Sequence, residues 1–120
     1  MNLELKEKIA LVTGSSSGLG FSIAKKLHKE GCYIILNGRN KTRLDRALKT
    51  FDERADAILG DVTQPDNCKK IENKIQKSLG KLNILICNVG SGSSVKPGEE
   101  TPEEWKRVFD VNFFSATNII

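Results

Sequence analysis

Thr13-Gly14-Ser15-Ser16-Ser17-Gly18-Leu19-Gly20 is the stretch of sequence that decides the fold. It follows residues 9–13, a short and continuously apolar segment that is typical of a strand buried on both faces. After it, Leu19, Ile23 and Leu27 recur every four positions, which predicts a helix that ends at Gly31. The stretch is therefore predicted to be a glycine-rich turn that joins a buried strand to a helix.

The same alternation continues along the chain. Further strands are predicted at residues 32–37, 55–60 and 82–87. Helices are predicted from an Asn40 cap to about Thr50, and from Pro65 to Leu79. Their inward residues are Leu44, Ala47, Leu48, Ile71, Ile75 and Leu79. Strands that alternate with helices of this length form β-α-β units, so the fold class is α/β with a doubly wound, Rossmann-like parallel sheet.

The last part of the sequence is predicted to be a loop over residues 89–100 and then one helix. Thr101-Pro102-Glu103-Glu104 reads as a capping box with proline at the first helical position. The apolar stripe of this helix is Trp105, Val108, Phe109, Ala116, Ile119 and Ile120. Asn112 falls on the same stripe, so we expect it to be buried and to need a hydrogen-bond partner such as a neighbouring carbonyl.

Length and composition exclude several classes of protein. The 120 residues suffice for one domain, residues 1–120, with 38% hydrophobic and 28% charged residues. No apolar run approaches the roughly 20 residues of a membrane span, and the first residues do not form a secretory signal. The three cysteines, Cys32, Cys68 and Cys87, include no C-x-x-C pair. We expect no metal site and a cytoplasmic location.

The positive charge does not indicate a nucleic-acid partner. The net charge is +4, with a calculated pI of about 9.0. However, the lysines are scattered over helical segments and lie beside acidic residues, which is typical of a solvated helix surface. No aromatic platform is interleaved with them.

The glycine turn has the residues needed to bind a pyrophosphate. Gly14 permits the tight turn, Gly18 lets the phosphates approach the backbone, and Gly20 allows close packing of helix and sheet. Amides at the helix start, aided by the helix dipole, hold the phosphates. The predicted cofactor contacts of the turn are Gly14, Ser16, Ser17, Gly18, Leu19 and Gly20. The alternative is a glycine-rich turn without a ligand; a P-loop is excluded because no G-K-[ST] follows.

Four sequence motifs, in this order along the chain, resemble those of the short-chain dehydrogenase/reductase family. They are T-G-x-x-x-G-x-G at Thr13, Asp61-Val62, Asn88-Val89-Gly90, and Asn112. The resemblance covers essentially the whole chain. It implies an NAD(P)-binding Rossmann domain, the amino-terminal half of an oxidoreductase that transfers hydride between a nicotinamide and a carbonyl or alcohol substrate. It also implies a homodimer or homotetramer, in which the final helix packs against a second subunit.

The resemblance assigns roles to the residues that match. Asp61, with Val62, binds the adenine ring, although Asp61 also reads as a turn or cap residue because Thr63 and Pro65 follow. Asn88 lies on the ribose side and Gly90 admits the cofactor. The family's usual N-N-A-G is here Cys87-Asn88-Val89-Gly90, so its first asparagine and its alanine are replaced.

The resemblance also assigns Asn112 a catalytic role, in which it holds a water of the proton relay. The family's acid is a tyrosine with a lysine four residues later, and a serine polarises the carbonyl. The only tyrosine here is Tyr33, with Asn37 four residues on. We therefore expect a domain truncated before the catalytic tyrosine and lysine. Within the family, the chain resembles 3-oxoacyl-carrier-protein reductases, which implies a carbonyl reductase.

The end of the second predicted strand favours NADPH over NADH. NAD-preferring folds place an acid there, whereas Leu36-Asn37-Gly38-Arg39-Asn40 has none. Arg39 is placed to meet a 2′-phosphate; the alternative is a solvated arginine. The missing acid also argues against a methyltransferase. A non-catalytic dinucleotide sensor on the same fold remains an alternative.

Overall fold

Four short apolar segments form the central sheet of the computed structural model, which describes residues 2–120. They are β1 (Ile9–Val12), β2 (Tyr33–Gly38), β3 (Ala55–Leu59) and β4 (Ile84–Ile86). All pairs are parallel, in the order β3-β2-β1-β4, and Leu11 lies opposite Ile35 on one side and Leu85 on the other. The strand order reverses between β1 and β4, which is where doubly wound sheets bind their ligands.

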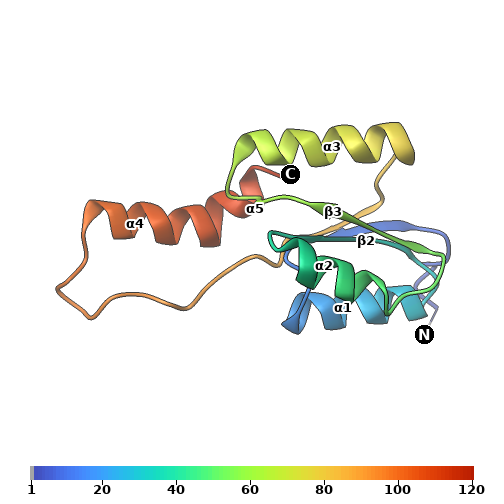
Figure 1. Cartoon of the computed structure of the whole chain (residues 1–120), viewed down its shortest axis with the longest axis horizontal. Coiled ribbons are helices and arrows are strands. Elements are labelled where there is room, and N and C mark those ends of the chain that lie inside the picture. Colours follow the sequence, from blue (N-terminus) through green and yellow to red (C-terminus); the bar gives the residue numbers. More distant parts are fainter. Residues whose placement is uncertain (1) are drawn as a thin grey trace.

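Helices cover both faces of the sheet (Figure 1). α1 (Gly18–Lys29) and α2 (Lys41–Leu48) lie on one face, and α3 (Pro65–Ser78) lies on the other. This arrangement confirms the predicted doubly wound α/β fold. It also explains why the strands are apolar on both sides.

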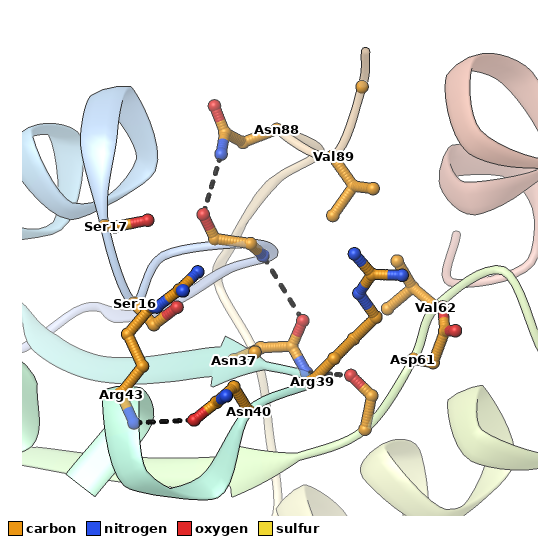
Figure 2. A pocket seen from close by; sticks show the side chains of 14 residues that line it. Ser16, Ser17, Asn37, Arg39, Asn40, Arg43, Asp61, Val62, Asn88 and Val89 are labelled. Carbon is orange, nitrogen blue, oxygen red and sulfur yellow. Dashed lines mark hydrogen bonds between the residues drawn. The ribbon is translucent and has the colours of Figure 1, made fainter. Parts of the chain in front are cut away.

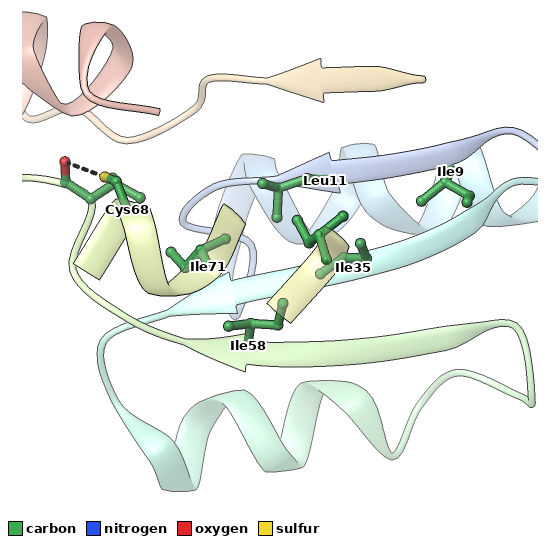
Figure 3. Close-up of a cluster of buried hydrophobic side chains, with 8 residues drawn as sticks. Ile9, Leu11, Ile35, Ile58, Cys68 and Ile71 are labelled. Atoms are coloured by element: carbon green, nitrogen blue, oxygen red, sulfur yellow. Dashed lines mark hydrogen bonds between the residues drawn. The ribbon is translucent and has the colours of Figure 1, made fainter. Parts of the chain in front are cut away.

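Alternate residues of β1 divide between two hydrophobic cores. Ile9 and Leu11 pack with the buried residues of α3, including Ile71 and Ile75 (Figure 3). Ala10 and Val12 pack on the opposite face against α1 and α2. Because successive side chains of a strand point to opposite faces, one four-residue strand anchors both layers.

Local signals at the helix ends are confirmed. The Asn40 side chain accepts a hydrogen bond from the Arg43 amide at 2.9 Å, and α1 ends before Gly31 at φ +101°. The Thr101 hydroxyl likewise accepts from the Glu104 amide at 3.1 Å. The second half of the predicted capping box is absent, because the Glu104 carboxylate instead pairs with Arg107 at 2.6 Å.

The apolar stripe of α1 differs from the prediction at its first residue. Leu19 lies on the surface with 71% of its area exposed, whereas Gly20 and Ala24 are buried. Ile23 and Leu27 are half-buried and pack on the sheet. The inward face of a helix is set by the way its axis meets the sheet, and here that contact begins at the glycine rather than at the leucine.

The predicted final helix forms without a break over residues 102–117, but a π-helical turn inside it interrupts the predicted apolar stripe. The segment is α4 (Pro102–Phe109), the π-helical turn η1 (Asp110–Phe114) and the short α5 (Ser115–Thr117). A π turn changes the angular spacing of the side chains, so one stripe cannot continue through it. Trp105, Phe109 and Ile120 are exposed, by 57%, 48% and 85%. α4 extends away from the sheet (Figure 1).

A partly buried cluster at the surface joins the end of α1 to the segment between α2 and β3. His28 Nε2 lies 2.8 Å from Asp52 Oδ1, and the His28 ring meets the Phe51 ring edge-on at 5.1 Å. The Lys25 ammonium lies 4.2 Å from the centre of the Phe51 ring. The Arg54 amide, followed by the His28 hydrogen bond, lowers the pKa of Asp52.

We expect Asp52→Asn to lower the midpoint of thermal unfolding at neutral pH. Because folding lowers the pKa of Asp52, its stabilisation is complete above the unfolded value of about 3.9 and is lost as the pH falls through the folded value. The difference between wild type and variant should therefore disappear in acid. Melting curves between neutral and acidic pH measure it, with the exposed neighbour Glu53→Gln as control. A difference that persists unchanged in acid would contradict the prediction.

Candidate functional site

A pocket of about 610 Å³ opens at the carboxyl ends of the strands (Figure 2). The glycine turn, the end of β2, the segment after β3 and the segment after β4 form its walls. Its lining residues are Gly14, Ser16, Ser17, Asn37, Gly38, Arg39, Asn40, Arg43, Gly60, Asp61, Val62, Asn88, Val89 and Gly90. This is the position, beside the reversal of strand order, at which the fold binds ligands.

The backbone of the turn requires glycine at two positions. Gly14 has φ +60° and Gly18 has φ +61°, both in the left-handed region. A Cβ on Gly14 would lie 2.9 Å from Cγ2 of Val89, so the valine that replaces the family's alanine packs directly on the turn. A Cβ on Gly18 would meet no atom within 4 Å. The protein therefore leaves space beside Gly18.

The third glycine of the turn lies in a closely packed place. A Cβ on Gly20 would lie 2.4 Å from Nδ2 of Asn88 and 2.5 Å from the Gly14 carbonyl oxygen. Gly20 is buried, and neither it nor Gly18 or Leu19 lines the pocket. The position of Gly20 agrees with the packing role that the sequence predicts for it.

The start of α1 faces the pocket with hydroxyl groups. Ser17 is the N-cap residue of α1, and its side chain makes no capping hydrogen bond. Ser16 and Ser17 both line the pocket. The positive end of the helix dipole and these hydroxyls together favour an anion there.

Asn37 holds the turn to the neighbouring strands, a role that the sequence analysis missed. Its buried side chain accepts from the Gly14 amide at 3.3 Å and donates to the carbonyls of Ile58 and Gly60 at 3.1 and 3.2 Å. Its backbone exchanges hydrogen bonds with Ser15, which is also buried. A polar residue directly after the apolar run 33–36, within the same predicted strand, was the available signal, because a buried amide needs partners.

Asn88 fastens the turn from the side of β4. Its amide donates to Oγ1 of Thr13 at 3.0 Å, and its Nδ2 donates to the Gly14 carbonyl at 3.0 Å (Figure 2). Asn37 of β2 and Asn88, which follows β4, thus bind Gly14 from the two strands on either side of β1. Cys87 replaces the first asparagine of the family's N-N-A-G motif. The hydrogen bonds of Asn88, the second asparagine, still join the end of β4 to Thr13 and Gly14 after β1.

Two arginines contribute to the pocket: in Figure 2 the Arg43 side chain extends toward Ser16, and the Arg39 side chain extends toward Val62 and Val89. Arg39 follows β2 and Arg43 belongs to the first turns of α2, and both line the pocket. Neither forms an ion pair with any residue in the described range 2–120. Asp61 is the one acid among the lining residues, so arginine exceeds acid by two to one. The pocket lining as a whole therefore favours an anionic group.

Asp61 occupies the place that the sequence predicts, and its side chain is already bonded within its own loop. Oδ1 accepts from the Thr63 amide at 2.9 Å and from the Thr63 hydroxyl at 2.7 Å. The reading of Asp61 as a turn residue is thus confirmed. One carboxylate has several acceptor positions, so the turn leaves it able to accept from a ligand as well.

Asn112 differs from the prediction because it is exposed. Its Nδ2 donates to the carbonyls of Ser91 and Val108 at 3.0 and 3.1 Å, and its Oδ1 accepts from the Ser91 amide at 2.8 Å. It therefore has the predicted carbonyl partner, although the π turn removes it from a buried stripe. A Cβ on Gly90 would lie 3.1 Å from the Asn112 Oδ1, so Asn112 lies close to the segment after β4 without lining the pocket.

The structure brings most of the predicted site residues together. Those that line the pocket are Gly14, Ser16, Ser17, Arg39, Asp61, Val62, Asn88 and Gly90. The lining residues absent from the prediction are Asn37, Gly38, Asn40, Arg43, Gly60 and Val89. Among residues 2–120, no group of three or more His, Cys, Asp or Glu side chains is placed to hold a metal ion. No helix in this part of the chain is long and apolar enough to span a membrane.

The fold and the pocket define a doubly wound α/β domain with a pocket at the switch point of the sheet, where such folds bind their ligands. Residues 8–120 match the family model described as short chain dehydrogenase. The chain belongs to this family.

Curated relatives agree with this assignment. An uncharacterised oxidoreductase of Staphylococcus epidermidis is 33% identical over 117 residues, which cover 98% of this chain and 51% of the relative. The uncharacterised oxidoreductase YvrD of Bacillus subtilis is 34% identical over 118 residues, covering 97% of this chain and 44% of the relative. The chain thus spans about half the length of the curated relatives it matches.

Solved structures show the same fold. L-Sorbose reductase from Gluconobacter frateurii, complexed with NADPH and L-sorbose, superposes with a TM-score of 0.93 at 31% identity. The match covers 99% of this chain and 47% of that one. The 3-ketoacyl-(acyl-carrier-protein) reductase from Brucella melitensis, complexed with NADH, has a TM-score of 0.88 at 28% identity and covers 96% and 48% of the two chains.

Proposed function

We propose that this chain is the NADP-binding half of an oxidoreductase that moves hydride between a nicotinamide and a carbonyl or alcohol carbon. The observation that carries the proposal is the glycine turn at the mouth of the pocket, where Gly18 leaves free space and Ser16 and Ser17 supply hydroxyls. The bound nicotinamide would supply the hydride. The residues described here would bind and orient the cofactor.

The pocket residues fit a dinucleotide. A pyrophosphate needs a backbone that it can approach, and Gly18 offers open space at a positive φ that side chains rarely adopt. Asp61 and Val62 are proposed to hold the adenine, and Asn88 and Gly90 to line the ribose and nicotinamide side. Asn112, bonded to Ser91 beside this segment, is proposed to hold a water of the proton relay.

The arginine pair supports NADPH as the preferred cofactor. Arg39 is exposed and Arg43 approaches the same pocket from α2 (Figure 2). Two planar guanidinium groups without ion-pair partners in the described range can bind a 2′-phosphate that NADH lacks. The neighbours include complexes with NADPH and with NADH, so the arginines carry this part of the proposal.

We expect wild type to bind NADPH more tightly than NADH and Arg39→Ala to lose this preference. A charge-assisted hydrogen bond contributes about 1.5–3 kcal/mol, or roughly one to two decades of affinity. Calorimetric titration of both nucleotides measures it. Arg46→Ala is the matched control, because Arg46 lies on α2 and does not line the pocket. Equal affinities of wild type for the two nucleotides would contradict the preference.

The partners proposed for the whole protein follow from the same family. The substrate is a small carbonyl or alcohol compound, and the protein is a homodimer or homotetramer in the cytoplasm. Exposed aromatic residues on α4 and η1 favour self-association: Trp105, Phe109, Phe113 and Phe114. Large exposed apolar patches mark interaction surfaces.

A further inference from the structure

Three polar side chains at the end of the chain contact the backbone beside the pocket. Asn112 bonds Ser91, Ser115 Oγ lies 3.4 Å from the Val89 carbonyl, and Asn118 Nδ2 donates to the Val62 carbonyl at 3.1 Å. Val62 and Val89 line the pocket (Figure 2). The three residues are spaced three apart and form one polar stripe, so the segment from η1 to α5 contacts two separate walls of the pocket.

Of the three contacts, the one made by Asn118 joins the two residues that are farthest apart in the sequence. It joins residues 56 positions apart and connects the end of α5 to the segment that follows β3. Val62 is 2% exposed, so its carbonyl has little access to water. The carbonyl also accepts from the Cys68 thiol at 3.4 Å, a weak donor, and the Asn118 amide is the stronger of its two partners.

The other contacts of this segment join it to β2 and α3, and only Asn118 bonds it to the end of the chain within the described residues. Asp61 Oδ1 bonds only Thr63 within the described residues, which shapes the turn without attaching it to another element. The Asp61 amide donates to Asn67 Oδ1 at 3.2 Å, which ties the turn to α3. The bond from Asn118 attaches the segment after β3 to the end of the chain, and Ser115 of the same end contacts the Val89 carbonyl after β4.

We infer that Asn118 is a positioning residue that sets the place of the Asp61-Val62 wall in the nucleotide pocket. The inference rests on the proposed function, because that wall is where the adenosine part of the cofactor would lie. Asn118 does not line the pocket itself. Its loss should therefore weaken binding of the adenosine half of the cofactor and leave the nicotinamide half unaffected.

Two variants test the inference on the 120-residue chain. Asn118→Ala removes the side chain, and Asn118→Leu keeps similar volume without the amide donor. Thr117→Val is the matched control, since Thr117 is the exposed neighbour whose hydroxyl donates only to the Phe114 carbonyl, at 3.3 Å, within residues 2–120. The probes are 2′,5′-ADP for the adenosine end and nicotinamide mononucleotide for the other end, each titrated by calorimetry or by ligand-observed NMR.

We expect both Asn118 variants to bind 2′,5′-ADP about three- to tenfold more weakly than wild type, as for the loss of one hydrogen bond. Binding of nicotinamide mononucleotide and all binding by Thr117→Val should be unchanged. Wild-type affinity for 2′,5′-ADP in both variants would overturn the role of Asn118 alone. Equal loss of both probes, or unfolding of both variants by circular dichroism, would overturn it by showing a general structural role. Failure of wild type to bind 2′,5′-ADP would overturn the proposed function as well.

Discussion

Gly18→Val should abolish measurable NADPH binding while the parallel sheet remains folded. Gly18 has φ +61°, and a Cβ there would meet no protein atom within 4 Å. The valine side chain would therefore stand in the open space beside the turn, where a pyrophosphate must approach the backbone. The folded state would carry strain of about 1–3 kcal/mol from the left-handed backbone, which a small domain can tolerate.

The chain offers a control that separates strain from obstruction. Gly80 has φ +73°, and a Cβ there would also meet nothing within 4 Å, but it follows α3 and is not part of the glycine turn between β1 and α1. Gly18→Val and Gly80→Val should lose similar amounts of thermal stability by circular dichroism. Only Gly18→Val should lose binding in a calorimetric titration. NADPH affinity of Gly18→Val within threefold of wild type would show that the turn is purely structural.

The other two glycines of the turn could not give this separation. A Cβ on Gly20 would collide with the Gly14 carbonyl oxygen at 2.5 Å, which is backbone and cannot move aside cheaply. A Cβ on Gly14 would lie 2.9 Å from Val89. Variants at these positions would disturb the packing of α1 against the sheet, so any loss of binding would be secondary.

The sequence predicts the sheet, the turn and most of the helices well because each depends on local pattern. Continuous apolar runs such as residues 9–12 occur where both faces of a strand are covered, and this pattern is independent of distant contacts. Asn40 and Gly31 mark helix ends through hydrogen bonds and backbone angles that involve only their neighbours. The glycine turn is recognisable because its backbone excludes other residues.

The features that the sequence did not predict depend on contacts between distant segments. Asn37 binds backbone groups of two other segments, the glycine turn at position 14 and the end of β3 at positions 58 and 60, which no periodic pattern reveals. Arg43 reaches the pocket because α2 begins directly beside the end of β2. The π turn at residues 110–114 coincides with the Asn112 side chain donating to the Val108 carbonyl, and it moves Trp105 and Asn112 off the expected stripe.

The residues Met1 to Ile120 alone should show no NADPH-dependent carbonyl reduction and should self-associate. Tyr33, the only tyrosine of the sequence, begins β2, whereas the pocket opens at the opposite, carboxyl ends of the strands. Burial and the nearby Asp56 raise the pKa of Tyr33, and the residue four positions later is Asn37 rather than lysine. General acid catalysis contributes about 10²–10⁴-fold, so its absence should remove detectable turnover.

Self-association is expected from two surfaces of the described chain. β4 pairs with β1 on one side and is an edge of the sheet within residues 2–120, and an unpaired strand edge recruits other chains. Trp105, Phe109 and Phe113 are each about half exposed, at 57%, 48% and 54%. Size exclusion with light scattering, together with NADPH oxidation against a panel of ketones and aldehydes, measures both properties, and Tyr33→Phe controls for background oxidation. A monomer whose turnover depends on Tyr33 would refute the prediction. Its proton donor would lie at the amino-terminal ends of the strands, opposite the pocket.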